Sequence, residues 1–176
     1  MVRKKTYDQQ TLLLDVWQTG NRVTEFFFEH LPDEVWGLKI PGAPRRSVRM
    51  IAGHIHNARC MWIKMFGKPY GIKPPASVDR RLVSRPALLR ALPRSSRGIS
   101  ALLSCGLKQG GTLKIRVPWA NIPSDIAHFM TYLMAHEAHH RGQIVLVARE
   151  SGHRLPQECT AGLWQWKMRQ REARSR

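Results

Sequence analysis

Four long helical segments, separated by proline and glycine breaks, constrain the fold of this 176-residue chain most strongly. The spacing of the apolar residues predicts helices over about residues 7–30, 47–66, 84–105 and 123–150. A shorter helix is expected over about residues 157–169, and only residues 112–117 alternate like a strand. We therefore predict one all-α domain over residues 1–176, a four-helix bundle with a short C-terminal helix.

The breaks between these helices are marked by their turn residues. Residues 37–44 and 67–78 are rich in glycine and proline and predict surface loops. Within the third helix, Pro86 suits a first turn. Pro93 predicts a kink there, or a split into two helices.

The charge of the chain is strongly positive, with a formal net charge of +17 and an isoelectric point near 11.0. Such a balance invites a nucleic-acid-binding interpretation. No homeodomain, zinc-finger or RNA-binding signature accompanies the charge, so specific nucleic-acid binding is not our favoured interpretation. An arginine-biased, solvated surface with weak phosphate affinity is the favoured account, and a non-enzymatic basic nucleic-acid-binding protein stays as an alternative.

The cysteines and the apolar runs bear on the expected compartment. Cys60, Cys105 and Cys159 are far apart and odd in number, which argues against a disulfide framework and against a cysteine-based zinc site. The basic N-terminus has no apolar signal region, and no apolar run approaches the roughly 20 residues needed to span a bilayer. We expect a cytoplasmic protein without a membrane segment.

His136 and His140 carry most of the functional information. They are four residues apart on the fourth predicted helix, which places both imidazoles on one face about 6 Å apart along the axis. The apolar stripe of that helix contains both histidines; it consists of Ile126, Phe129, Leu133, His136, His140, Ile144 and Val147. Buried imidazoles need hydrogen-bond partners or a metal, because an unpaired buried polar group costs about 1–3 kcal/mol.

A third ligand is expected from the second predicted helix. His54 and His56 lie about 200° apart around its axis, so they cannot both face the bundle centre. His54 shares its face with Ile51, Ala58 and Met61, whereas the face of His56 includes Arg49. We therefore predict that His54, His136 and His140 bind one divalent metal. Three imidazoles suit zinc, nickel, iron and copper alike.

Three neutral imidazoles leave part of a metal's coordination shell open, as in catalytic sites. A metal-dependent enzyme acting on a small-molecule substrate is therefore predicted, with water or substrate in the open position of the metal. Glu137 and His139 flank the ligands and are our candidates for a supporting partner or proton carrier. Glu137 and Arg141 could instead form a surface ion pair.

These residues resemble the DinB family, which includes the YfiT-like proteins and thiol-dependent S-transferases and isomerases. The resemblance rests on Gly53-His54-Ile55 with Trp62 eight residues on, the block HEAHHRGQ at 136–143, Gly152 with Pro156, and GLWQW at 162–166. It implies a four-helix bundle with a long crossover connection, and often a homodimer. It also implies a divalent metal (zinc, nickel, iron or manganese) held by His54, His136 and His140, with a low-molecular-weight thiol as cosubstrate in characterised members.

The same block also matches HExxH, the zinc metallopeptidase motif in which the glutamate is the general base. The extended form of that motif needs a glycine and a third histidine, but Gln143 and Leu146 stand at those positions. Glu158 is the only candidate for a downstream glutamate ligand, and it follows a predicted helix break. The peptidase therefore remains an alternative to the DinB-like enzyme.

Overall fold

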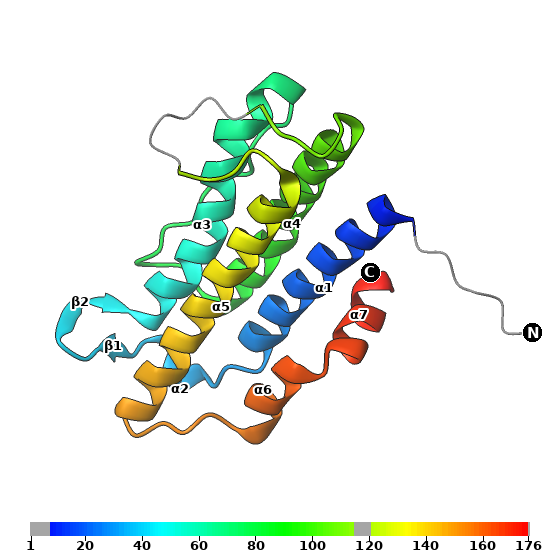
Figure 1. Ribbon diagram of the computed structural model, residues 1–176. Coiled ribbons are helices and arrows are strands. Elements are labelled where there is room, and N and C mark those ends of the chain that lie inside the picture. The colour runs from blue at the N-terminus through cyan, green and yellow to red at the C-terminus, as the bar shows by residue number, and fades with distance from the viewer. Residues whose placement is uncertain (1–7, 115–120, 176) are drawn as a thin grey trace, which may run out of the picture.

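A bundle of four long helices forms the body of the protein in a computed structural model, which describes residues 8–114 and 121–175 (Figure 1). The long helices are α1 (Gln9–Glu29), α3 (Val48–Gly67), α4 (Arg85–Lys108) and α5 (Ile126–Glu150). The side chains of Asp8, Ser84 and Asp125 cap the N-termini of α1, α4 and α5 by accepting backbone N–H hydrogen bonds. The predicted all-α bundle is confirmed.

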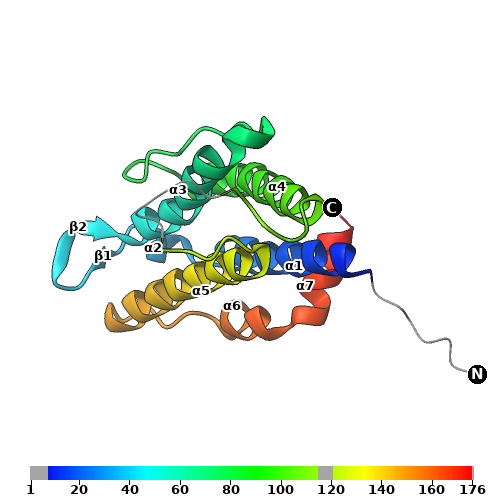
Figure 2. The same ribbon diagram turned by 45° about the horizontal axis from the view of Figure 1, so that its top comes forward.

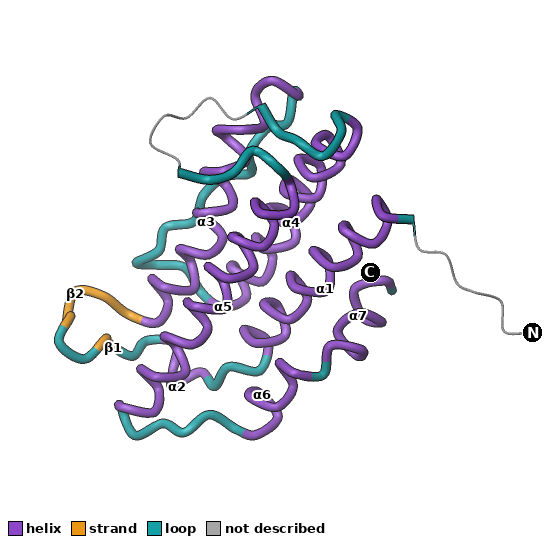
Figure 3. Tube along the Cα trace, in the orientation of Figure 1, coloured by secondary structure: helices purple, strands orange, loops and turns teal. Residues whose placement is uncertain are grey.

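The long connection between α3 and α4 runs back along α3. After a 3₁₀ turn (η1, Lys68–Tyr70), successive loop residues meet α3 in nearly reverse order. Ile72 N–H donates to the carbonyl of Gly67, Val78 exchanges two 2.9 Å hydrogen bonds with the side chain of Asn57, and Arg80 lies against Gly53. Helix α4 therefore begins at the same end of the bundle as α3, as the tube in Figure 3 shows. This is the long crossover that the family resemblance implies.

Short elements fill the ends of the bundle. Between α1 and α3 lie α2 (Asp33–Trp36) and a hairpin of β1 (Lys39–Ile40) and β2 (Ala43–Ser47), where the sequence predicted only a loop. At the C-terminus the predicted single helix is instead α6 (Gln157–Ala161), a 3₁₀ turn (η2, Gly162–Trp164) and α7 (Trp166–Arg174). Helix α7 packs beside α1, as Figure 1 shows, and Figure 2 shows it at the N-terminal part of α1. A Cβ at Gly162 would come within 2.3 Å of Phe26, so a close approach to α1 accompanies the break.

Two further expectations have separate outcomes. The predicted split at Pro93 is wrong, because α4 is one helix from Arg85 to Lys108 with Pro93 inside it. Packing against both α1 and α3 holds the helix through the proline. The predicted strand at 112–117 lies partly outside the described residues. Within them, Thr112 forms an isolated bridge with Asp125.

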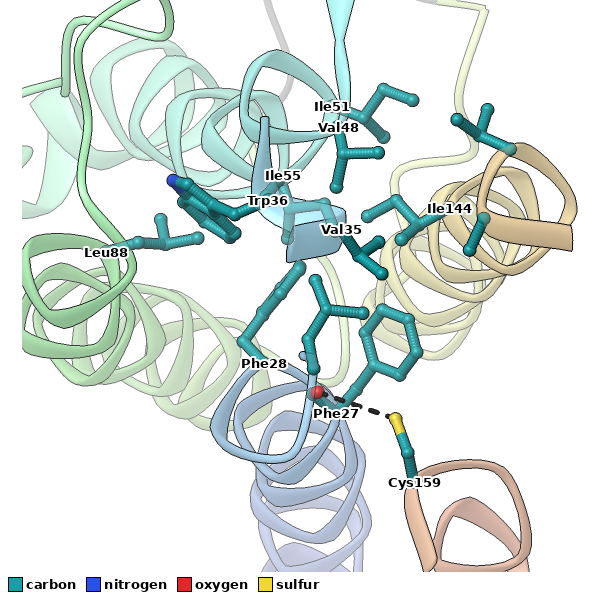
Figure 4. Packing of buried hydrophobic residues seen from close by; sticks show 14 of the residues in the cluster. Phe27, Phe28, Val35, Trp36, Val48, Ile51, Ile55, Leu88, Ile144 and Cys159 are labelled. Atoms are coloured by element: carbon teal, nitrogen blue, oxygen red, sulfur yellow. Dashed lines mark hydrogen bonds between the residues drawn. The ribbon is translucent and has the colours of Figure 1, made fainter. Parts of the chain in front are cut away.

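The core consists of two apolar clusters stacked along the bundle. Figure 4 shows the first, in which Phe27 and Phe28 of α1 meet Ile51 and Ile55 of α3 and Ile144 of α5. The second lies further along the bundle; its buried members include Trp17, Trp62, Phe66, Phe129 and Leu133. Along α3, His54 falls between Ile51 and Ile55 of the first cluster, about two turns before Trp62 of the second. Among the described residues, no helix combines the length and the apolar character that crossing a membrane requires.

Two glycines give opposite predictions for substitution by alanine. A Cβ at Gly106 in α4 would come within 2.2 Å of Ile126 Cγ2, whereas a Cβ at the exposed Gly142 in α5 would meet nothing within 4 Å. Gly106→Ala should therefore destabilise the protein by about 1–3 kcal/mol through overpacking. Gly142→Ala should stabilise it by about 0.5–1 kcal/mol through helix propensity. Urea unfolding of both variants checks this, and a stabilised Gly106→Ala would contradict the packing of α4 on α5.

Candidate metal centre

Helices α3 and α5 bring His54, His136 and His140 to one point. The Nε2 atoms of His54 and His136 are 3.2 Å apart, and those of His136 and His140 are 3.0 Å apart. One ligand atom from each of the three side chains lies within 4.8 Å of the other two. All three residues are half-buried, so the cluster lies at a seam between the helices and remains accessible from outside. The apolar stripe of α5 therefore faces the bundle as predicted.

The surroundings keep the three imidazoles neutral. Burial is the main cause that lowers the pKa of His54, His136 and His140, and repulsion from a neighbouring histidine adds to it in each case. For His136 the pKa falls to about 4. Neutral imidazole is the form that binds a metal, so at neutral pH the cluster has the protonation state of a ligand set.

A hydrogen bond fixes which nitrogen of His140 faces the cluster. The Nδ1 atom of His140 lies 2.8 Å from Oε1 of Gln143, one turn further along α5. The amide oxygen can only accept, so Nδ1 carries the proton and Nε2 presents its lone pair to the other histidines. Metal-binding histidines commonly have such a partner on the second nitrogen. Gln143 is the last residue of the HEAHHRGQ block, and its role was not predicted.

The lowered pKa values predict a pH effect on the metal-free protein. Between about pH 6.5, where unfolded histidine titrates, and about pH 4, where folded His136 titrates, the unfolded chain binds more protons. Stability should therefore fall as the pH decreases from 7.5 to 5, and His136→Gln should weaken this dependence. Urea unfolding at the two pH values measures it, with His153→Gln as the control outside the cluster. An equal pH dependence in His136→Gln and the wild type would contradict the prediction.

Glu137 points away from the histidines into a buried polar cluster. It is only 2% exposed, and its carboxylate oxygens accept 2.7 Å hydrogen bonds from Nε and Nη2 of Arg59 and from the hydroxyl of Thr24. Burial alone would raise the pKa of Glu137, but the guanidinium of Arg59 and these hydrogen bonds hold it below its usual value. The predicted surface pair with Arg141 is therefore wrong. Glu137 is buried, and its direct partner is on α3.

Arg59 was missed by the sequence reasoning and is central to this cluster. It is 1% exposed, donates to Oδ1 of Asn21 at 2.7 Å, and lies over the ring of Trp17. The ion pair of Arg59 and Glu137 therefore joins α3 and α5, the two helices that supply the histidines. Glu137 directly follows His136 on α5, and Arg59 follows His54 by five residues on α3. The ion pair therefore lies behind the histidine cluster.

The other histidines are arranged differently. His56 is fully buried on the opposite side of α3, with Nδ1 3.0 Å from Oγ of Ser95 and Nε2 3.0 Å from the carbonyl of Ala76. His139 is exposed, with its ring 5.2 Å from that of His140. His128 is exposed and bonded to Asp125. Of the described histidines, cysteines and acidic residues, only His54, His136 and His140 come together as a group that could hold a metal.

Comparison with known proteins gives one result at the level of the family. A search among curated proteins finds no match to this chain. The model of the DinB family, in contrast, matches residues 1–172 of the 176. The match spans all four long helices and the three-histidine cluster. The chain therefore belongs to the DinB family.

Proposed function

We propose that His54, His136 and His140 hold one divalent metal, and that the protein is a metal-dependent enzyme acting on a small molecule. The observation that carries this proposal is the convergence of three neutral imidazoles, each offering one nitrogen within 4.8 Å of the others. Three protein ligands leave a coordination position for a thiol or water, which is typical of catalytic sites. The family membership of the chain supports the same assignment.

The metal would supply Lewis acidity, which lowers the pKa of a thiol or water toward neutrality and makes it nucleophilic. The transfer of a low-molecular-weight thiol, or hydrolysis by water, is the reaction class that follows. Gln143 orients His140 through its hydrogen bond. His139, exposed beside His140, is the proposed carrier for the proton that the thiol or water releases.

The alternative of an HExxH metallopeptidase has less support from the geometry. In that mechanism the glutamate must act as a base on a water beside the metal. Glu137 is instead bound on both oxygens inside the bundle, by Arg59 and Thr24. We propose that Glu137 positions α5 against α3 and carries no proton in the reaction.

The homodimer that the family resemblance implies is a separate proposal, which sedimentation of the untagged protein tests.

Cobalt substitution gives a direct test of metal-assisted thiol activation. We expect the Co²⁺-loaded protein to develop a near-ultraviolet absorption band on titration with 2-mercaptoethanol, because thiolate sulfur then coordinates the ion. The band should appear with an apparent pKa well below that of the free thiol. His153→Gln should behave as the wild type. If the spectrum of the Co²⁺-loaded wild type did not change on addition of the thiol, the proposed activation of a thiol would be refuted.

A further inference from the structure

A pocket of about 220 Å³ lies between the β1–β2 hairpin, α3 and α5, and no step described so far uses it. Its lining consists of Ile40, Arg46, Ile51, Gln143, Leu146, Val147 and Glu150. Four of these side chains are apolar. Leu146 is 54% exposed, which is unusual for a leucine within a helix that otherwise buries its apolar face. The side chain of Leu146 forms part of the pocket wall.

The pocket adjoins the three histidines. Ile51 precedes His54 by three residues on α3. On α5, Gln143 follows His140 by three residues and is hydrogen-bonded to it. Residues three apart on a helix are neighbours on one face. Val147 lies one further turn along α5. The pocket therefore runs from the histidine cluster along the seam of α3 and α5 toward the hairpin. Figure 4 shows Ile51 on the α3 side of this seam, across from α5.

Arg46 supplies the positive charge in the lining of the pocket. This exposed residue of β2 has no ion-pair partner among the described residues. Its positive charge contributes to the lowered pKa of both His54 and His140, which agrees with a position near them. The one carboxylate in the lining is Glu150, which lies about 10 Å along α5 from Gln143.

We propose that this pocket is the substrate pocket of the metal centre and takes a small organic carboxylate with an apolar body. The apolar body would lie against Ile40, Ile51, Leu146 and Val147, and the carboxylate would pair with Arg46. A guanidinium forms paired hydrogen bonds with a carboxylate in one plane, which selects this group over a neutral one. The link to the metal rests on the proposed function, whereas binding in the pocket does not.

Hexanoate and 1-hexanol are the matched probes. Their binding to the ¹⁵N-labelled, metal-free protein is measured from changes in amide chemical shifts. The titrations are made at about 0.15 M salt, which screens distant charges. We expect hexanoate to shift the amides around residues 40, 46, 51, 143 and 146, and to bind about tenfold more tightly than hexanol, as one charge-assisted hydrogen-bonded pair implies. Equal binding of the two probes, or shifts confined to another surface, would overturn the proposal.

Two variants and one control locate the interaction. Arg46→Gln should weaken hexanoate about tenfold and leave hexanol unchanged, by the same pair energy. Leu146→Ser should weaken both probes, and this exposed position carries little of the fold. Arg90→Gln, an exposed arginine on α4, is the control for the general positive charge. An effect of Arg90→Gln as large as that of Arg46→Gln would mean nonspecific attraction and would sink the assignment.

Proximity to the metal is measured separately. In the Co²⁺-loaded protein, the paramagnetic ion should shorten the relaxation times of bound hexanoate protons, and excess zinc should abolish this effect. Hexanoate that binds the pocket without relaxation enhancement would separate the pocket from the metal centre. A protein that binds no Co²⁺ would instead refute the proposed function, while the metal-free titration would still decide the pocket.

Discussion

Replacing His140 by alanine should lower the affinity for Zn²⁺ by more than about a hundredfold, which exceeds the usual cost of losing an outer partner of a metal site. His140 supplies one of only three imidazoles at the cluster, and its Nε2 atom lies 3.0 Å from that of His136. The two remaining histidines, His54 on α3 and His136 on α5, hold a divalent ion weakly. Competition with a chromophoric chelator measures the affinity, and His54→Ala should give the same loss from the facing helix.

The fold should survive this change. His140 is half-buried, its side chain bonds only Gln143 and the neighbouring histidines in the described structure, and alanine favours the helix. The far-ultraviolet circular dichroism of the metal-free variant should therefore match that of the wild type. His128→Ala, which removes an exposed histidine from the same helix, should keep the full affinity. Wild-type affinity in His140→Ala would remove His140 from the ligand set.

Replacing Glu137 by alanine should reduce the free energy of unfolding by about 3–5 kcal/mol, because it leaves the guanidinium of Arg59 buried without its counter-ion. Arg59 is 1% exposed and donates two of its hydrogen bonds to Glu137. The hydroxyl of Thr24 would also lose its carboxylate partner. Urea unfolding measures the change. Glu150→Ala, at the exposed end of the same helix, should stay within about 0.5 kcal/mol of the wild type.

A second variant separates the buried charge from the cavity that alanine leaves. The double replacement of Arg59 by Met and Glu137 by Leu removes both charges at similar volume, so it should recover a large part of the lost stability. If Glu137→Ala and the double variant were equally unstable, packing and not the unpaired charge would explain the loss. A Glu137→Ala variant as stable as the wild type would contradict the buried ion pair itself.

The sequence predicted the long helices and the candidate histidines because both depend on local periodicity. Helix α5 illustrates this: its apolar spacing identified a face that includes His136 and His140, and Ile126, Leu133 and Ile144 of the same stripe are buried. The choice of His54 over His56 was also correct for the cluster. The low accessibility of His56 was not anticipated, since its partners come from α4 and the 71–84 loop.

Contacts between distant segments account for what the sequence did not predict. Glu137 and Arg59 are 78 residues apart, so a search for partners within one helix assigned Glu137 to Arg141 at the surface. Pro93 in isolation predicts a break, but packing on two neighbouring helices keeps α4 continuous. The pocket at Arg46 depends on a two-stranded hairpin whose segment, rich in glycine and proline, predicted only a loop.

X-ray absorption of the zinc-loaded wild-type protein tests the central claim most directly. The account predicts three imidazole nitrogens at about 2.0–2.1 Å and one exchangeable light ligand, which a sulfur atom at about 2.3 Å replaces when 2-mercaptoethanol is added. His54→Ala should lose the ordered site. A zinc ion with four protein ligands whose coordination does not change when the thiol is added would contradict an open three-histidine centre. Zinc bound without the imidazole signature would contradict it as well.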